Sequence, residues 1–555
     1  MRSILIASAV LILSSSCTSC GADRSLTPAH AQEPVAEPPP GPDSRPSPRS
    51  PLGTNLDFPY DWSEAVPFVD AFRLSRPWAS SRGMGQPDDN RPLALDEHGW
   101  VSRLGEDQIA RSGVLWDVPH ARGGRYTIRW RGSGRLITHG SATVVERGEG
   151  TMTVDFEPQL GSGLGLAIEQ TDPDDPIRDI RVLPPGGACR EDRTAYCEQS
   201  SDGCECLSFV EHHEELLFHP DFLRTMGIYS VIRFMNWQLI NDSEHETWDD
   251  RPRLDDAQWA RDGVPPEILA ELCNRLGAHP WVHVPHRADD GYARELGRVM
   301  REHLDPSLRV RIELSNEVWN HIFAAWQWAS DHGLELGLIE PDGDRGVAQI
   351  RWVAHRSVEI FAAFDEGFGD RDRVIHVLPS AAVNPWVTQV MFEYRDTAAH
   401  TDELAIAPYF GPLVGPDLRD EVRQGGVDHA LDLAEESLEE VEEWIRGHVR
   451  LAREHDIPVV AYEGGQHLVG VGGVENDEAI TEILHAANRH PRMGRLYDRY
   501  LRMWREAGGT LFVHFVNAGG WGRHGTWGAL EHARQESSPK QAALERFVQE
   551  NPPWW

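Results

Sequence analysis

The sequence predicts an α/β protein: a (β/α)8 barrel, or TIM barrel, with a small β-sandwich domain inserted near its N-terminus. From about residue 215 onward, short apolar strand patterns alternate with helical patterns, which implies a parallel sheet with helical crossovers. Between about 95 and 185 the pattern changes to short alternating strands with glycine-rich turns, which is typical of a sandwich. A chain of 555 residues is too long for one compact core, so two or more domains are expected.

The barrel prediction rests on a count of strands. A short apolar stretch at 52–56 supplies the first strand, and seven more lie in the second part of the chain, so the sandwich becomes an insertion after the first strand. One intervening helix, at 435–452, places Leu438, Val441 and Ile445 on one face. The later strands are expected at 228–234, 280–284, 309–315, 373–378, 404–409, 458–462 and 510–516.

The sandwich prediction rests on alternating segments at 125–131 and 151–156 and on a further strand at 164–169. Such a domain could bind sugar or could brace the barrel, and the sequence leaves both open. The expected division of the folded chain is 52–94 for the first barrel strand and a connecting segment, 95–185 for the sandwich, 186–214 for a cysteine-rich loop and 215–550 for the barrel.

An export signal is expected at 1–22, followed by a tether at 23–51. Residues 4–13 form an apolar core that is too short to span a bilayer, and three serines then precede Cys17. Cys17 looks like a bacterial lipoprotein processing site, so a lipid anchor in the outer membrane is expected, with plain secretion as the alternative. The tether is rich in proline and has no means of packing a core.

Four cysteines fall within the loop at 186–214: Cys189, Cys197, Cys204 and Cys206. In an exported protein this density favours disulfides over a metal site, although a zinc site remains the alternative. Cys204 and Cys206 are too close in sequence to bond easily with each other. We therefore expect them to pair with Cys189 and Cys197, with the connectivity left open.

The net charge and the tryptophan content limit the classes of partner that are expected. The formal net charge of −35 argues against a polyanionic partner such as nucleic acid. The chain has 20 tryptophans against 17 phenylalanines, and a flat indole ring can stack on the C–H face of a sugar. We expect a carbohydrate partner, contact with a membrane through the lipid anchor only, no cofactor, no metal and a monomeric chain.

Two glutamates stand where expected barrel strands end. Glu317 follows the strand at 309–315, and Glu463 follows the strand at 458–462 with two glycines behind it. The carboxyl ends of barrel strands are where such folds keep their chemistry, so the two suggest a pair of catalytic carboxylates. The alternative makes Glu317 a helix-capping acid and Glu463 a solvated loop residue.

At these residues the chain resembles clan A of the glycoside hydrolases, the (β/α)8-barrel retaining glycosidases. The motifs are S-N-E-V-W-N at 315–320 on the fourth strand and A-Y-E-G-G at 461–465 on the seventh, and the resemblance covers 52–56 and 215–550 but not the sandwich. It implies an O-glycosyl hydrolase that cleaves β-linked polysaccharide or oligosaccharide outside the cytoplasm by a two-glutamate double displacement. A non-catalytic carbohydrate-binding surface lipoprotein is the alternative.

The resemblance also implies roles for single residues. Glu317 would be the acid/base and Glu463 the nucleophile, with their carboxyl groups about 5–5.5 Å apart. Asn316 would bind the sugar 2-hydroxyl, and Tyr409 would hydrogen-bond Glu463. Arg233 would hold Glu463 ionised, because a neighbouring cation lowers the pKa of a carboxyl.

Further substrate contacts are expected around the same rim. His286 is expected to contact sugar hydroxyls, although the run with His283, Asp289 and Asp290 could instead bind a metal and serve a metal-dependent hydrolase. Clan members usually end strand eight with a tryptophan, which this chain lacks there. The tryptophans expected to form subsites are Trp237, Trp319, Trp386, Trp521 and Trp527, with Trp521 or Trp527 replacing the missing one.

Overall fold

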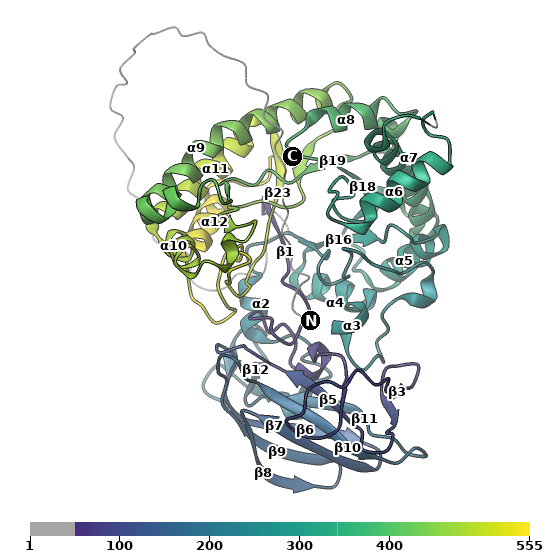
Figure 1. Ribbon diagram of the computed structural model, residues 1–555, viewed down its shortest axis with the longest axis vertical. Coiled ribbons are helices and arrows are strands. Elements are labelled where there is room, and N and C mark those ends of the chain that lie inside the picture. The colour runs from purple at the N-terminus through teal and green to yellow at the C-terminus, as the bar shows by residue number, and fades with distance from the viewer. Residues whose placement is uncertain (1–49, 341, 555) are drawn as a thin grey trace.

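The fold is a closed barrel of parallel strands, as the sequence predicts (Figure 1). The computed structural model describes residues 50–340 and 342–554, so the expected export signal, Cys17 and nearly all of the tether lie outside the described residues. Each strand pairs with the next along the chain, and the last strand closes on the first. The barrel strands are β1 (Leu52–Asn55), β15 (Val231–Arg233), β16 (His279–Val284), β17 (Val310–Leu314), β18 (Val374–Pro379), β19 (Glu403–Ile406), β21 (Val459–Ala461) and β23 (Gly509–His514).

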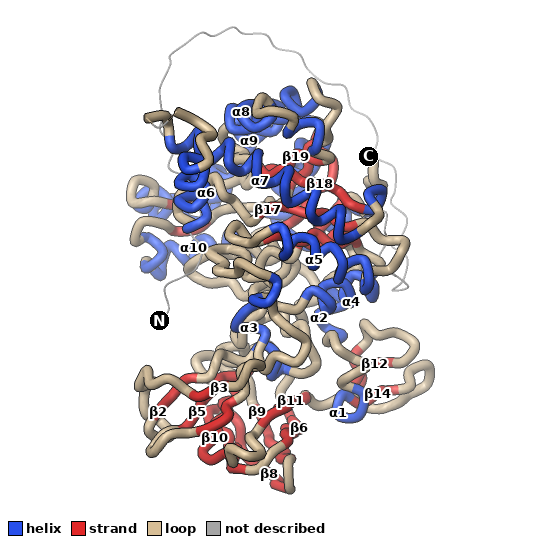
Figure 2. The backbone as a smooth tube through the Cα atoms, turned by 90° about the vertical axis from the view of Figure 1, so that its right-hand side faces the viewer, coloured by secondary structure: helices blue, strands red, loops and turns tan. Residues whose placement is uncertain are grey.

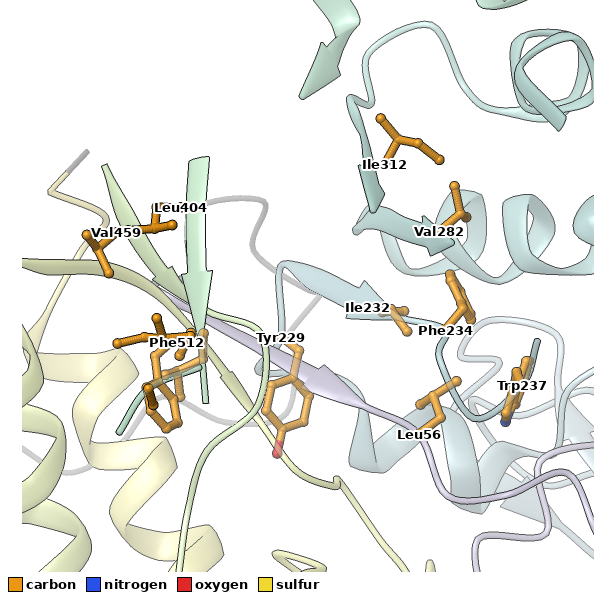
Figure 3. Packing of buried hydrophobic residues seen from close by; sticks show 14 of the residues in the cluster. Leu56, Tyr229, Ile232, Phe234, Trp237, Val282, Ile312, Leu404, Val459 and Phe512 are labelled. Carbon is orange, nitrogen blue, oxygen red and sulfur yellow. The ribbon is translucent and has the colours of Figure 1, made fainter. Parts of the chain in front are cut away.

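Alternation along the strands separates two layers of side chains. Ile232, Val282 and Ile312 point outward into the main core between strands and helices (Figure 3). Their neighbours point inward, where an apolar cluster that includes Trp281 and Val460 fills part of the barrel. The remaining interior is charged, because two arginine–glutamate pairs lie inside the barrel.

Helices cover the outside of the barrel (Figure 2). Their ends follow ordinary capping chemistry: the Asp289 side chain accepts from the backbone of Tyr292 at the start of α5, and Gly277 ends α4 with a φ of 62°, which favours glycine. The helices are α1 (Phe209–His212), α2 (Pro220–Thr225), α3 (Trp259–Asp262), α4 (Pro266–Leu276), α5 (Asp290–His303), α6 (Ala324–Glu335), α7 (Arg345–Phe368), α8 (Pro385–Phe392), α9 (Arg419–Arg453), α10 (Glu478–Arg489), α11 (Pro491–Ala507) and α12 (Pro539–Glu550).

The inserted domain is a sandwich of two four-stranded sheets, in the orders β2-β5-β10-β7 and β11-β6-β9-β8. Inward residues of both sheets, among them Ile128, Val154 and Leu166, share one core. The domain lies beside the barrel, where Arg122 of the sandwich forms two hydrogen bonds with Asp221 of α2 (Figure 1). Its strands are β2 (Ala79–Ser81), β5 (Ile109–Val114), β6 (Gly124–Arg131), β7 (Gly134–Gly140), β8 (Ala142–Gly148), β9 (Thr151–Phe156), β10 (Leu164–Thr171) and β11 (Arg178–Leu183).

The cysteine-rich loop forms a small sheet closed by two disulfides. Cys189 bonds with Cys204 and Cys197 with Cys206, which confirms the expected pairing and supplies the connectivity. All four thiols are consumed, so the zinc alternative for this loop is wrong. The short strands of the chain are β12 (Gly187–Cys189), β13 (Tyr196–Cys197) and β14 (Cys206–Ser208) here, and β3 (Ala94–Leu95), β4 (Val101–Arg103), β20 (Leu413–Val414) and β22 (Val469–Gly470) elsewhere.

Within residues 50–340 and 342–554, no helix combines the length and the apolar composition that crossing a bilayer requires.

Candidate active site

One small pocket lies among the strand ends of the barrel, and both predicted glutamates line it. Glu317 follows β17 and Glu463 follows β21, and the carboxyl ends of parallel barrel strands meet at one face. The two side chains are nearly buried, because their residues are 4% and 5% exposed. The pocket is lined by Met235, Asn241, Asn316, Glu317, Phe323, Tyr409, Glu463, His467, Phe515 and Trp527.

A cation and a hydroxyl hold Glu463. Arg233 Nη1 donates to Oε1 at 2.8 Å, and the Tyr409 hydroxyl donates to Oε2 at 3.0 Å. The contact between Tyr409 and Glu463 is the one that the resemblance implied. Both donors favour the ionised carboxylate, and Glu463 is not the solvated loop residue of the alternative interpretation.

Only neutral groups donate to Glu317. The Tyr462 hydroxyl donates to Oε1 at 3.2 Å, and the side-chain amide of Asn320 donates to Oε2 at 3.1 Å. The backbone of Glu317 has a φ of 43°, and that of Ser315 a φ of 54°, a left-handed region that non-glycine residues rarely occupy. Such backbone strain concentrates at functional sites. Glu317 does not cap the following helix, since α6 begins after Phe323.

Arg233 connects the two glutamates to the barrel interior. It is fully buried, and its Nε and Nη2 grip both oxygens of Glu313 at 3.0 Å each. Nη1 also donates to the side chain of Asn55 at 3.2 Å, and Nη2 to that of Asn316 at 2.8 Å. With Glu463 added, five hydrogen bonds occupy the five N–H groups of the guanidinium.

Burial dominates the titration of the pocket carboxyls. For Glu463, burial raises the pKa to about 8, with the charge of Glu317 adding to the rise and Arg233 and Tyr409 opposing it. Burial likewise raises the pKa of Glu317 above its usual range. Because each carboxylate disfavours ionisation of the other, the two carboxyl groups titrate as a pair.

Arg233, expected to hold Glu463 ionised, is bound by a second carboxylate as well, that of Glu313. Burial raises the pKa of Glu313, but the neighbouring Arg233 and His283 more than compensate and bring it below the usual range. Glu313 is thus a full anion that balances the guanidinium charge. Arg233 still donates to Glu463 and is the largest influence that opposes the rise of its pKa on burial.

Asn316, expected to bind a sugar 2-hydroxyl, lines the pocket but is already held by the protein. Its Oδ1 accepts from Arg233, and its Nδ2 donates to the side chain of Asn241 at 3.0 Å. One N–H of its amide is left for a ligand. Asn241 itself lines the pocket, next to Asp242, whose φ is 58°.

Of the five expected subsite tryptophans, Trp527 alone lines the pocket. Trp319 is half-buried beside the site and donates to the Tyr462 hydroxyl at 3.3 Å, so it supports a partner of Glu317. Trp386 is 49% exposed at the start of α8, and Trp521 packs on Lys540. Neither of these two is part of the pocket, because α8 and the loop after β23 direct their rings elsewhere.

Two predictions at the rim are wrong. Trp237 is 1% exposed and packs in the main core outside the barrel strands, because the segment after β15 lies against Phe68 and against Phe222 of α2 (Figure 3). His286 is buried against the Trp328 ring and does not line the pocket. Neither side chain is placed to contact a sugar there.

The strand-three residues do not gather as a metal site in the described part of the chain. His283 points into the barrel, with its Nε2 at 3.1 Å from Glu313, whereas His286 packs outside the pocket. Asp289 caps α5, and Asp290 pairs with Arg356. The metal-dependent alternative therefore lacks its ligand set.

A buried lysine fixes the loop that carries Trp527. Lys540, the single lysine of the sequence, donates to the carbonyl of Thr526 at 2.5 Å and lies 4.4 Å from the Trp521 ring centre. Gln466, three residues after Glu463, donates to the same carbonyl at 2.9 Å. The Trp527 loop is thereby tied both to α12 and to the strand end of the second glutamate.

Three residues in or beside the pocket were not predicted from the sequence: Glu313, Asn241 and His467. Glu313 had a usable signal, because it alternates with apolar residues in β17 and so marks an inward charged position. Asn241 and His467 carried no such signal, since each lies in an irregular loop whose course depends on the tertiary fold.

Comparison with known proteins gives likenesses of fold. No family model matches the sequence, and no curated protein matches it. Among solved structures, a GH51 arabinofuranosidase from Xanthomonas axonopodis pv. citri matches with a TM-score of 0.40 and 10% identity, over 59% of this chain and 65% of that one. The endo-beta-1,4-mannanase from Thermotoga petrophila matches with 0.32 and 13%, over 58% and 70%.

A Bacteroidetes-affiliated GH5 cellulase matches with a TM-score of 0.32 and 11% identity, over 60% of this chain and 87% of that one. The present chain thus spans just under two thirds of the arabinofuranosidase. GH51 and GH5 designate glycoside hydrolase families, the class of protein that the sequence resembles. At these scores the matches carry no argument about activity, and the barrel assignment rests on the strand order of this chain.

Proposed function

We propose that this protein is a retaining glycoside hydrolase that cleaves β-linked polysaccharide or oligosaccharide. One observation carries the proposal: two buried carboxyl groups share a pocket but have unequal partners. Glu463 receives hydrogen bonds from Arg233 and Tyr409, whereas Glu317 receives them from neutral groups only. Retaining hydrolysis requires this asymmetry, because one carboxyl must be charged and the other protonated.

In the proposed mechanism Glu463 is the nucleophile and Glu317 the acid/base. In this mechanism the pair holds one proton and Glu317 carries it, because of the two carboxyl groups Glu463 is the one that accepts a hydrogen bond from a cation. Glu463 attacks the anomeric carbon while Glu317 gives its proton to the departing glycosidic oxygen. Glu317 then removes a proton from water, the water oxygen displaces Glu463 from the sugar, and the enzyme returns to its starting state. The two carboxyl groups are predicted to lie about 5–5.5 Å apart.

The remaining pocket residues fit supporting roles. Tyr409 would steady the Glu463 carboxylate before attack and release it afterward. Asn316 would offer its one unused amide N–H to the sugar 2-hydroxyl. Trp527, held by the Thr526 carbonyl, would provide the flat surface under the reacting sugar that strand eight does not supply.

The proposed place of action is outside the cytoplasm, on a monomer anchored through lipid at Cys17. Two disulfides in one short loop support export, because such bonds persist in oxidising compartments. The apolar run at 4–13 ahead of Cys17 and the proline-rich stretch at 23–51 support a tethered enzyme.

Two variants test the roles against each other on an activated aryl β-glycoside that the parent cleaves. Glu463→Ala should abolish turnover, by a factor on the order of 10⁴ or more, because no covalent intermediate can form. Glu317→Ala should retain the first step, since an activated leaving group needs no proton, and should then stall. Azide needs no base and should restore turnover as the β-glycosyl azide.

Glu246→Ala is the matched control, since this glutamate lies on an exposed loop after β15 and its side chain is 61% exposed. It should behave as the parent. If Glu317→Ala is inactive on the activated substrate and azide changes nothing, the acid/base assignment is wrong. If both pocket variants keep parental activity, the active site lies elsewhere.

A further inference from the structure

The pocket offers a bound sugar no positive charge. Among the described residues that line it, the acidic side chains are Glu317 and Glu463, of which Glu463 is the ionised one in the proposed mechanism. The other members are four apolar side chains and four uncharged polar ones, and no arginine or lysine is among them. A carboxylate or sulfate on the sugar would therefore enter beside the Glu463 carboxylate without a cation to balance it.

Arg233, the nearest guanidinium, is not free to serve as that cation. It is 0% exposed and lies behind the carboxyls rather than on the pocket wall. Its five N–H groups are all engaged, by Glu313, Glu463, Asn55 and Asn316. A substrate anion could contact it only by breaking bonds that hold the Glu463 carboxylate.

His467 is a neutral polar group on the same wall. Its ring lies between Tyr409 and Trp527, with centroids 4.8 and 5.9 Å away. In the described part of the chain its side chain has no hydrogen-bond partner, although its backbone N–H is bonded to Phe410. Burial lowers the pKa of His467 to about 4, so at neutral pH the ring presents one donor and one acceptor but no charge.

We propose that the sugar held in this pocket is uncharged, and that His467 binds one of its hydroxyl groups. The inference rests on the proposed glycosidase function and adds the substrate class. Two features produce the selectivity: a hydroxyl finds a partner on His467, and an anionic substituent meets Glu463 and Glu317 in a site without a free cation. Rejection through an unpaired buried charge is an effective source of specificity.

Matched pairs of aryl glycosides test the charge of the sugar. Each pair shares ring stereochemistry and anomeric configuration and differs only in a C6 hydroxymethyl or carboxylate group, with gluco, galacto and manno members as both anomers. We expect at least one neutral member to be cleaved, with kcat/KM for its carboxylate partner lower by about 100-fold or more. Cleavage of any uronide as fast as its neutral partner overturns the inference but leaves the glycosidase function intact. Cleavage of no member of this panel, nor of the matched xylosides and arabinofuranosides, contradicts the glycosidase function and removes the inference with it.

Removal of single hydroxyls tests His467. With the best neutral glycoside, His467→Phe should lower kcat/KM about 10- to 100-fold, while His467→Gln, which keeps a donor and an acceptor, should lower it less. Among monodeoxy analogues of that glycoside, one should be cleaved equally by the parent and by His467→Phe, because its missing hydroxyl is the one that His467 binds. Equal losses on every deoxy analogue, or no loss on any substrate, would contradict the proposed contact.

Discussion

Two arginine–glutamate pairs lie inside the same barrel, and one of them, Arg233 with Glu313, contacts residues that line the pocket. Arg233 grips Glu313 at 3.0 Å through two donors, and Arg311 grips Glu403 at 2.8 Å through two donors. All four residues are at most 7% exposed. The Trp281 ring lies near both guanidinium groups, with its centre 5.6 Å from Arg233 and 5.9 Å from Arg311.

Position along the strands distinguishes the pairs. Arg233 ends β15 and Glu313 stands near the end of β17, so their pair reaches the carboxyl-end face and contacts Glu463. Glu403 begins β19, and the pair with Arg311 lies toward the opposite end. The same bidentate chemistry therefore tunes a pocket carboxylate at one level and serves the stability of the barrel at the other.

Removing each arginine should give the largest difference between the pairs. Arg233→Met leaves Glu313 and Glu463 buried without a cation, so the nucleophile becomes protonated and kcat/KM falls on the order of a thousandfold. Arg311→Met leaves Glu403 unpaired far from the pocket and should lower stability while preserving activity per folded molecule. Parallel activity assays and thermal melts of both variants check this. Equal losses of activity in the two folded variants would contradict the claim that Arg233 acts on catalysis and Arg311 on stability.

Glu403→Gln should be the more destabilising of the two glutamate substitutions. Arg311 then loses its bidentate partner inside the barrel, and breaking a buried pair costs about 3–5 kcal/mol. Glu313→Gln should cost less, because Arg233 keeps Glu463 as a partner. Urea unfolding of both variants measures the difference. A larger loss of unfolding free energy in Glu313→Gln than in Glu403→Gln would contradict this and would show that the Arg233–Glu313 pair stabilises the barrel more.

Glu313→Gln should instead change the pH dependence of catalysis. Burial raises the pKa of Glu317, so kcat/KM of the parent should fall at alkaline pH, where Glu317 loses the proton that it gives to the leaving group. The Glu313 anion adds to that rise and Arg233 opposes it, so in Glu313→Gln the pKa of Glu317 falls and the basic limb should move down by about one pH unit. Glu403→Gln should leave the limb in place. A profile unchanged in Glu313→Gln would contradict the shared-cation account.

The sequence predicted the barrel and the two glutamates because both depend on local order. Strand alternation and a polar residue at a strand end are visible in a short window, and Glu317 and Glu463 share the pocket as expected. Trp237 and His286 also follow expected strands, but their side chains are buried in packed regions. The three-dimensional course of the loops decides which side chains near the strand ends face the pocket, and a short sequence window does not contain that information.

The pairing of Arg233 with Glu313 could not be predicted from the sequence, for another reason. The two residues are separated by 80 positions and meet only when β15, β16 and β17 assemble in register. A strand pattern shows that Glu313 faces inward but does not show which cation meets it. The resemblance therefore implied an Arg233 devoted to Glu463, where the structure has one cation shared by two carboxylates.

The central claim is that Glu463 attacks the sugar, and trapping the glycosyl-enzyme tests it most directly. An activated 2-fluoro glycoside of a sugar that the protein cleaves forms the covalent intermediate readily and releases it slowly, because the fluorine disfavours the second step. Peptide mass spectrometry should then find one glycosyl group per chain, on Glu463, and none in Glu463→Gln. A label on Glu317 or Glu313, or normal turnover of the parent substrate by Glu463→Gln, would contradict the account.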